Sequence, residues 1–227
     1  MKNIKKKINT LIISDIHLGD SSTRCKEILS LLKKYSFKRL ILNGDILDGL
    51  NFNRLHTKHW EILSKFRELS AKREVVWVLG NHDAPGHVLF KLLGIKVCHR
   101  YSWIYNGKKF LAIHGHQFDK FLSNNYILSQ IAFIFYDALK KIDKKRILVD
   151  YIKLHNKTWK RGSSEVAKGA LRLAKLLKAD YVFCGHTHKL LEKKKKGKRY
   201  FNTASWNEAP SGYITIGHDG VFLKVQD

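Results

Sequence analysis

Leu11-Ile-Ile-Ser-Asp15-Ile-His17 is an apolar, strand-like run that ends in two residues able to bind a metal. Four further stretches repeat this arrangement: Leu40-Ile-Leu-Asn-Gly-Asp45, Val75-Val-Trp-Val-Leu-Gly-Asn81-His82-Asp83, Phe110-Leu-Ala-Ile-His114-Gly-His116 and Tyr181-Val-Phe-Cys-Gly-His186-Thr-His188. Ligands of open α/β sheets bind at the carboxyl ends of the strands, so we expect these five ends to converge. The sequence therefore predicts a metal centre at one edge of a sheet.

The surrounding pattern predicts helices in the first half of the chain and hairpins in the second. Strands are expected over residues 9–14 and 39–43, and apolar residues recur at helical intervals over residues 25–35 and 58–72. Asn106-Gly107 separates two strand-like runs, which is the strongest short signal of a β-hairpin. Further hairpins are expected at 190–203 and 214–225. Alternation of this kind favours sheets flanked by helices.

Composition limits the classes of function. The chain has 227 residues, 44% of them hydrophobic, which is enough for one sizeable core. Its 43 Lys and Arg against 19 acids give a net charge of +24. This charge favours nucleic acid, an anionic membrane or a phosphorylated substrate as partner, with compositional drift as the alternative explanation. Three Cys without metal-type spacing fit a cytoplasmic protein, and no apolar run is long enough to span a bilayer.

The candidate ligands indicate the kind of metal. They combine carboxylates, one amide oxygen and imidazoles: Asp15, His17, Asp45, Asn81, His114, His186 and His188. Such a mixed set suits two divalent ions, with Mn²⁺ expected and Fe²⁺ or Zn²⁺ as alternatives. Seven ligands are too many for one ion, whereas two ions about 3.5 to 4 Å apart, bridged by one carboxylate, would use them all. That pair is the arrangement used for in-line phosphoryl displacement.

The order of the motifs carries a family resemblance. Asp-x-His, Gly-Asp-x-x-Asp, Gly-Asn-His-Asp, His-Gly-His and Gly-His-Thr-His follow one another between residues 12 and 188, and in this the chain resembles the calcineurin-like metallophosphoesterase superfamily. The resemblance implies an α/β (α+β) fold: a four-layer αββα sandwich of two mixed β-sheets flanked by helices. It also implies a single metallophosphoesterase domain over residues 1–227 and a metal-dependent hydrolase of phosphodiester or pyrophosphate bonds.

The resemblance further implies a role for each motif residue. One metal would be held by Asp15, His17, Asp45 and His188, and the other by Asp45, Asn81, His114 and His186, so that Asp45 bridges the two. His82 resembles the residue that contacts the scissile phosphate and protonates the leaving group, with Asp83 orienting it. His116, two residues from a ligand, is a candidate supporting residue.

Finer features are similar to the UDP-2,3-diacylglucosamine diphosphatases of lipid A synthesis. These features are His114-Gly-His-Gln-Phe-Asp119, the long insertion after it, and Tyr200-Phe-Asn-Thr-Ala-Ser-Trp206-Asn-Glu208. Enzymes of that subgroup cleave the pyrophosphate of a nucleotide-linked diacyl sugar, releasing UMP and a lipid monophosphate. The match departs at His82, where many members have Arg, and at His116 and Ser205, where Asp is common.

The insertion itself predicts a helical cap over about residues 118–165. Apolar residues from 118 to 142 cover more than one helical face, and residues 139–161 carry nine Lys or Arg against two Asp. This pattern favours acyl chains and an anionic membrane surface, with Phe133, Tyr136 and Arg161 as candidate substrate-binding residues. A dimer contact, or a packed cap with a solvated basic face, is the alternative.

The expected function is therefore a pyrophosphatase for a nucleotide-linked lipid, cytoplasmic and peripheral on the inner membrane face. A soluble phosphodiesterase or nuclease acting on nucleotides or nucleic acid is the alternative, and a scaffold without activity is disfavoured because all seven candidate ligands are present. The sequence does not indicate the oligomeric state.

Overall fold

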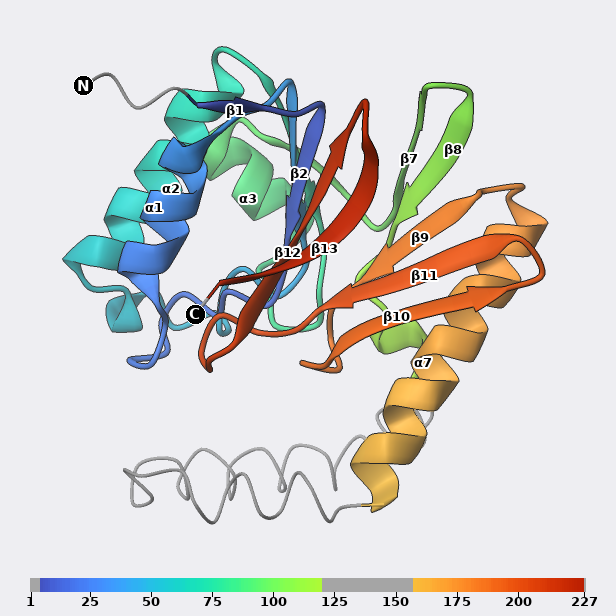
Figure 1. Cartoon of the computed structure of the whole chain (residues 1–227). Helices are drawn as coiled ribbons and strands as arrows, with labels where there is room; N and C mark the ends of the chain where they lie inside the picture. The colour runs from blue at the N-terminus through green and yellow to red at the C-terminus, as the bar shows by residue number, and fades with distance from the viewer. Residues whose placement is uncertain (1–4, 120–156, 227) are drawn as a thin grey trace.

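The computed structural model describes residues 5–119 and 157–226, whose strands form two large sheets (Figure 1). The six-stranded sheet has the order β13-β12-β2-β4-β5-β6, and the five-stranded sheet has the order β10-β11-β9-β8-β7. The first contains β2 (Thr10–Ile13), β4 (Arg39–Asn43), β5 (Glu74–Val78), β6 (Lys96–Cys98), β12 (Ser211–Gly217) and β13 (Gly220–Gln226). The second contains β7 (Tyr101–Tyr105), β8 (Lys108–Ala112), β9 (Tyr181–Cys184), β10 (Leu190–Lys195) and β11 (Lys198–Thr203). A separate two-stranded sheet pairs β1 (Lys6–Lys7) with β3 (Tyr35–Ser36).

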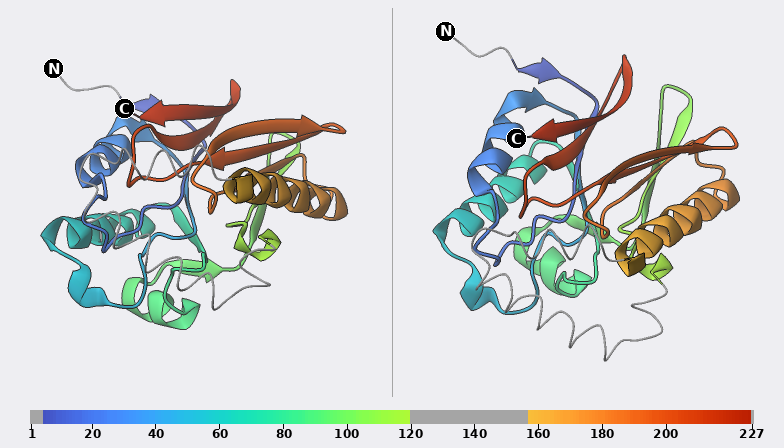
Figure 2. Two further views of the ribbon diagram at one scale, coloured as in Figure 1. Left: turned by 90° about the horizontal axis from the view of Figure 1, so that it is seen from below. Right: turned by 60° about the horizontal axis from the view of Figure 1, so that its bottom comes forward.

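Helices cover the outer face of each large sheet (Figure 2). α1 (Cys25–Lys34), α2 (Thr57–Ser70) and α3 (Gly86–Leu93) pack on the six-stranded sheet, and α7 (Lys157–Leu176) packs on the five-stranded sheet. Two short 3₁₀ turns, η1 (Phe52–Arg54) and η2 (His116–Phe118), lie in loops. The layers therefore run helix, sheet, sheet, helix, and the predicted four-layer sandwich of two mixed sheets is confirmed.

The apolar runs of the sequence are strands buried on both faces. In β2, Leu11 and Ile13 face the helices, whereas Ile12 faces the second sheet. β5 repeats the alternation, with Trp77 on the helix side and Val76 between the sheets. Successive side chains of a strand point to opposite faces, so a strand covered on both sides must be apolar throughout.

Parallel pairing brings the motif residues to one edge of each sheet. β2, β4, β5 and β6 are parallel neighbours in the six-stranded sheet, and β8, β9 and β11 are parallel neighbours in the five-stranded sheet. The loops that follow β2, β4, β5, β8 and β9 carry the five motifs. Parallel strands thus place these loops together, as the sequence predicts.

α7 packs on the five-stranded sheet through small side chains such as Ala167, Ala170 and Ala174. At Gly169 a Cβ would lie 2.6 Å from the ring of Phe118, so only glycine permits this approach. The helix begins inside the predicted cap and contains the position of Arg161. Phe133 and Tyr136 lie outside the described residues. No helix within 5–119 and 157–226 has the length and hydropathy needed to cross a membrane.

Candidate metal centre

The motif residues gather into three groups at the carboxyl edges of the strands. The groups are Asp15, His17 and His188; Asp45, His114 and His186; and His17, Asp48 and His82. Within each group the ligand atoms lie within 4.8 Å of one another. All six Asp and His residues among the seven expected to bind metal are therefore brought together. The seventh, Asn81, follows β5 directly before His82, and its side chain is exposed.

The first group joins the loop after β2 to the loop after β9. Nε2 of His188 lies 3.3 Å from Oδ1 of Asp15 and 3.1 Å from Nε2 of His17. Nδ1 of His17 lies 3.2 Å from Oδ1 of Asp48, which accepts its proton and leaves the Nε2 lone pair facing His188. A cation between these three side chains would be bound by all of them.

The second group is centred on Asp45, the expected bridging ligand. Oδ2 of Asp45 lies 3.1 Å from Nε2 of His114, and both side chains are buried. Nδ1 of His114 donates to the carbonyl oxygen of Asn43 at 3.0 Å, so a neutral ring turns a lone pair toward the carboxylate. Two acceptors in this position require a cation or a proton between them. The donor set therefore fits a divalent ion.

The same geometry sets the charges of these groups. Burial alone would lower the pKa of His114, but the carboxylate of Asp45 outweighs burial and raises the pKa to about 10 in the absence of metal. Burial would raise the pKa of Asp45, but His114 lowers it well below its usual range. Burial likewise opposes the ionisation of Asp15, and the hydrogen bond with His188 outweighs it and lowers the pKa. Both carboxylates therefore stay charged, as metal ligands must.

Backbone hydrogen bonds tie the two groups together. The backbone N–H of His186, whose ring belongs to the second group, donates to Oδ1 of Asp15 in the first group at 2.8 Å. The backbone N–H of His17 donates to the carbonyl oxygen of Asp45 at 3.0 Å. The two groups are thus neighbouring parts of one site.

Glycines and unusual backbone angles shape the loops that carry the ligands. A Cβ would lie 2.1 Å from Oδ2 of Asp15 at Gly185, 2.1 Å from Oδ1 of Asp45 at Gly80, and 2.3 Å from Nδ1 of His114 at Gly44. Five candidate ligands have φ between 48° and 67°: Asp15, His17, Asp45, His186 and His188. Such backbone conformations concentrate at functional sites because the surrounding structure must hold them.

Asp83 stabilises the loop that carries Asp45. Its carboxylate accepts hydrogen bonds from the backbone N–H groups of Asp45, Ile46, Leu47 and Gly80 at 2.8 to 3.0 Å. The expected task of orienting His82 is not tested by these contacts and stays a prediction. A carboxylate of Asp48 also lies beside His82, with its Oδ1 3.7 Å from Nδ1 of His82. Oδ2 of Asp48 pairs with Arg54 at 2.8 Å.

A family model described as calcineurin-like phosphoesterase matches residues 8–190 of the sequence. The chain belongs to this family. A curated relative, the DNA polymerase II small subunit of Thermoplasma acidophilum, is 25% identical over 225 residues. The match covers 86% of this chain and 44% of that protein, so the chain spans less than half the length of the relative.

Solved structures share the fold of this phosphoesterase. An archaeal phosphodiesterase has 14% identity and a TM-score of 0.55, covering 96% of this chain and 99% of that one. YfcE, a phosphoesterase from E. coli, has 16% identity and a TM-score of 0.54, covering 93% and 90%. At such identities the likeness shows the fold alone. Family membership supports a phosphoester hydrolase, and the Asp and His groups are consistent with a divalent metal centre.

Two residues around the calcineurin-like centre have no assigned role in the sequence pattern. One is Asp48, the second Asp of Gly-Asp-x-x-Asp, which contacts His17 and lies near His82. The other is Asp119, whose Oδ2 lies 3.1 Å from Nε2 of His186 and so holds this ring from the start of the insertion. His116 is near the second group: burial, with the neighbouring His114, lowers the pKa of His116 to about 4, so its ring is neutral.

Proposed function

We propose that the protein is a two-metal hydrolase that cleaves a phosphodiester or pyrophosphate bond. The observation that carries the proposal is the pair of Asp and His groups joined through His186 and Asp15 at the carboxyl edges of the strands. One ion would be held by Asp15, His17, Asp45 and His188, and the other by Asp45, Asn81, His114 and His186. Two divalent ions in this position supply electrophilic stabilisation of the phosphoryl oxygens and an activated water.

His82 is placed to act on the substrate rather than on the metals. Its backbone N–H donates to Oδ1 of Asp45 at 2.9 Å, which fixes the loop beside the expected bridging ligand. Its ring centroid lies 5.1 Å from that of His17, and its side chain is 23% exposed. From this position His82 would contact the scissile phosphate and deliver a proton to the leaving oxygen.

The test of this function is an assay of the purified full chain, stripped of metal and then supplied with Mn²⁺. Bis(p-nitrophenyl) phosphate serves as a generic diester, and a nucleotide sugar serves as a pyrophosphate. Hydrolysis that requires Mn²⁺ and is lost in Asp45→Ala is expected. A correctly folded wild type that binds two ions and hydrolyses neither substrate would contradict the proposal.

The finer proposal is that the substrate is a UDP-diacylglucosamine-type lipid, cleaved to UMP and a lipid monophosphate. Its support is the resemblance of the motifs and the insertion, which is apolar and then basic. The run from Tyr200 to Glu208 contributes less, because its asparagines have structural tasks. Asn207 donates to Asp20 at 2.9 Å, and Asn202 donates to the carbonyl oxygen of Gly185 beside the first group.

The lipid proposal is tested at the insertion. Changing Phe133 and Tyr136 to Ser should raise KM for the lipid substrate and leave the generic diester unaffected, because only acyl chains gain from apolar contacts. Anionic vesicles should bind the protein in a salt-dependent manner. Equal losses of activity on the lipid substrate and on the generic diester, in a variant that folds correctly, would contradict the proposal of a lipid substrate.

A nuclease is the second candidate, favoured by the net charge of +24 and by the relative named as a DNA polymerase subunit. The Lys-rich hairpin of β10 and β11 does not extend this charge to the metal site. Parallel pairing sets Arg199 opposite Tyr181, at the start of β9, whereas His186 follows the end of β9. Arg199 itself pairs with Glu192 at 2.5 Å. Release of nucleotides from short DNA, without cleavage of the lipid substrate, would favour the nuclease.

A further inference from the structure

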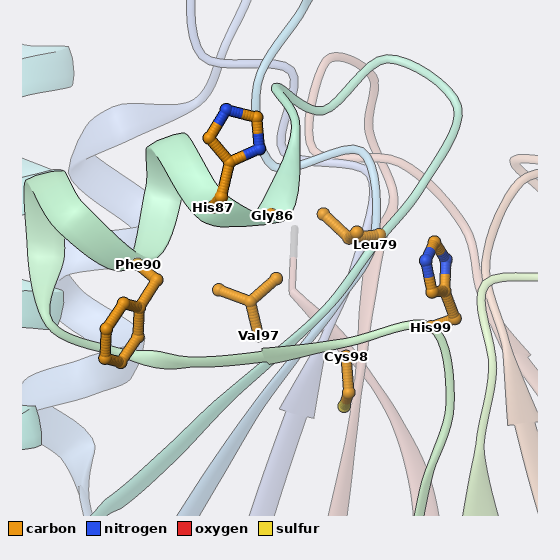
Figure 3. Close-up of a pocket in the computed structure, with 7 residues that line it drawn as sticks. All are labelled: Leu79, Gly86, His87, Phe90, Val97, Cys98 and His99. Carbon is orange, nitrogen blue, oxygen red and sulfur yellow. The ribbon is translucent and has the colours of Figure 1, made fainter.

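A cavity of about 420 Å³ lies between α3 and the end of β6 (Figure 3). Its lining is Leu79, Gly86, His87, Phe90, Val97, Cys98 and His99. Figure 3 shows Val97 in the space between the helix and the strand, Leu79 and His99 to one side of this space, and the ring of His87 on the other side of the helix ribbon in this view. Its volume is in the range of small-molecule sites.

The cavity continues the row of strand ends that holds the candidate ligands. Asp15 follows β2, Asp45 follows β4, Asn81 follows β5, and His99 follows β6, the next parallel strand of the sheet. Leu79 lies two residues before Asn81, a reach of at most about 7 Å along the chain. The loop that carries Asn81 and His82 therefore begins at the wall of the cavity, and a group esterified to a phosphate at His82 would have the cavity as its neighbour.

The lining selects among the groups that a phosphoester substrate carries. Leu79 and Val97 make the cavity too apolar to favour a second phosphate or a sugar. Burial raises the pKa of the Cys98 thiol, so this side chain is neutral and apolar as well. Phe90 is 58% exposed, so its aromatic side chain is accessible to a ligand that could stack on it. His87 and His99 offer ring nitrogens that match the donors and acceptors of a heteroaromatic ring, whereas an alkyl chain would leave them unused.

We infer that this cavity is the specificity subsite for the planar, nucleobase-like group of the substrate, stacked on Phe90. The inference rests on the proposed phosphoesterase function and deepens it. Stacking on an aromatic side chain tolerates different bases because every base has a π-face. A nucleotide-linked substrate would thus be recognised by its base here and by its phosphate at the metals.

The test compares Phe90→Ala with the matched control Leu92→Ala, which removes another exposed side chain of the same helix. The substrates are thymidine 5′-p-nitrophenyl phosphate and methyl p-nitrophenyl phosphate, which share the leaving group and differ in the nucleoside. Phe90→Ala should lower kcat/KM for the nucleoside diester by roughly 5- to 150-fold, the range of base stacking, and leave kcat/KM for the methyl diester unchanged. Leu92→Ala should change neither. Equal effects on both diesters, or none, would overturn the inference. A third substrate, an octyl diester, serves as a further check. A loss of kcat/KM in Phe90→Ala that is confined to this octyl diester would also overturn the inference, because it would identify an alkyl chain as the occupant.

Binding separates this inference from the proposed function. If the wild type hydrolyses neither a diester nor a nucleotide sugar, the proposed function fails, and calorimetry with UMP and ribose 5-phosphate still tests the subsite. UMP should bind the wild type at least fivefold more tightly than ribose 5-phosphate, and Phe90→Ala should remove most of this difference. Equal affinities of the wild type for the two ligands would overturn the subsite.

Discussion

Gly185→Ala adds a single methyl group to the loop after β9 and should disable one metal site. The new Cβ would lie 2.1 Å from Oδ2 of Asp15 and 2.5 Å from Oγ of Ser14. Carbon and oxygen atoms that do not bond pack at about 3.5 Å, so the Asp15 carboxylate must retreat by about 1.4 Å. It would then leave the N–H of His186 and the hydroxyl of Ser14, both of which donate to it.

This displacement should be measured as a loss of metal and of activity. Overpacking at a buried position costs about 1 to 3 kcal/mol of unfolding free energy, and a misplacement of about 1 Å in a catalytic group costs about 100-fold in rate. We expect Gly185→Ala to bind close to one Mn²⁺ per chain, by elemental analysis after dialysis, and to lose about 100-fold in kcat/KM. The control is Gly217→Ala, where the nearest atom is Ile8 Cγ2 at 4.0 Å. A Gly185→Ala variant with two ions and the activity of this control would refute the reasoning.

Three further substitutions test the bridging ligand, the proposed acid and His59, a buried histidine of α2. Asp45→Ala should leave fewer than two bound ions and no detectable turnover, because both sites lose a ligand; two tightly held ions would exclude the bridging role. His82→Ala should lower kcat by about 10²- to 10⁴-fold with near-normal metal content, and loss of metal would make His82 a ligand instead. Burial, with the neighbouring His56, lowers the pKa of His59 to about 4. Neutral His59 therefore makes its full contribution to the free energy of unfolding above about pH 6.5. As the pH falls from 6.5 to 4, up to about 3 kcal/mol of this free energy should be lost. In His59→Gln, the free energy of unfolding measured in urea should depend less on pH over this range. Parallel curves of this free energy against pH for the wild type and the variant would show that His59 is not the cause.

The strands that position the site were predictable because each is buried on both faces. β4 spans Arg39–Asn43, as expected, since its apolar run is needed for contact with both layers. β10 and β11 extend beyond the expected residues into the Lys-rich turn, because backbone pairing in a hairpin does not require apolar side chains. α3 and β6 are short, with eight and three residues, so neither shows a periodicity that predicts it. The cavity between these two elements was missed for the same reason.

The candidate ligands were predictable because they follow strands directly. Their supporting contacts were not, because they join loops that are distant in the sequence. Asp83 is 36 to 38 residues away from the three amides of the Asp45 loop that it binds. Asp48 meets His17 only because β2 and β4 are parallel neighbours. Local sequence contains the ligand types, and the pairing of the strands decides which carboxylate supports which imidazole.

The central claim is that two divalent ions share Asp45 at the carboxyl edges of the strands. The most direct measurement is anomalous X-ray diffraction from crystals of the full chain loaded with Mn²⁺. The account predicts two anomalous peaks about 3.5 to 4 Å apart, one beside Asp15, His17 and His188 and the other beside His114 and His186, with Asp45 between them. A single peak at saturating Mn²⁺, or two peaks that Asp45 does not bridge, would contradict it.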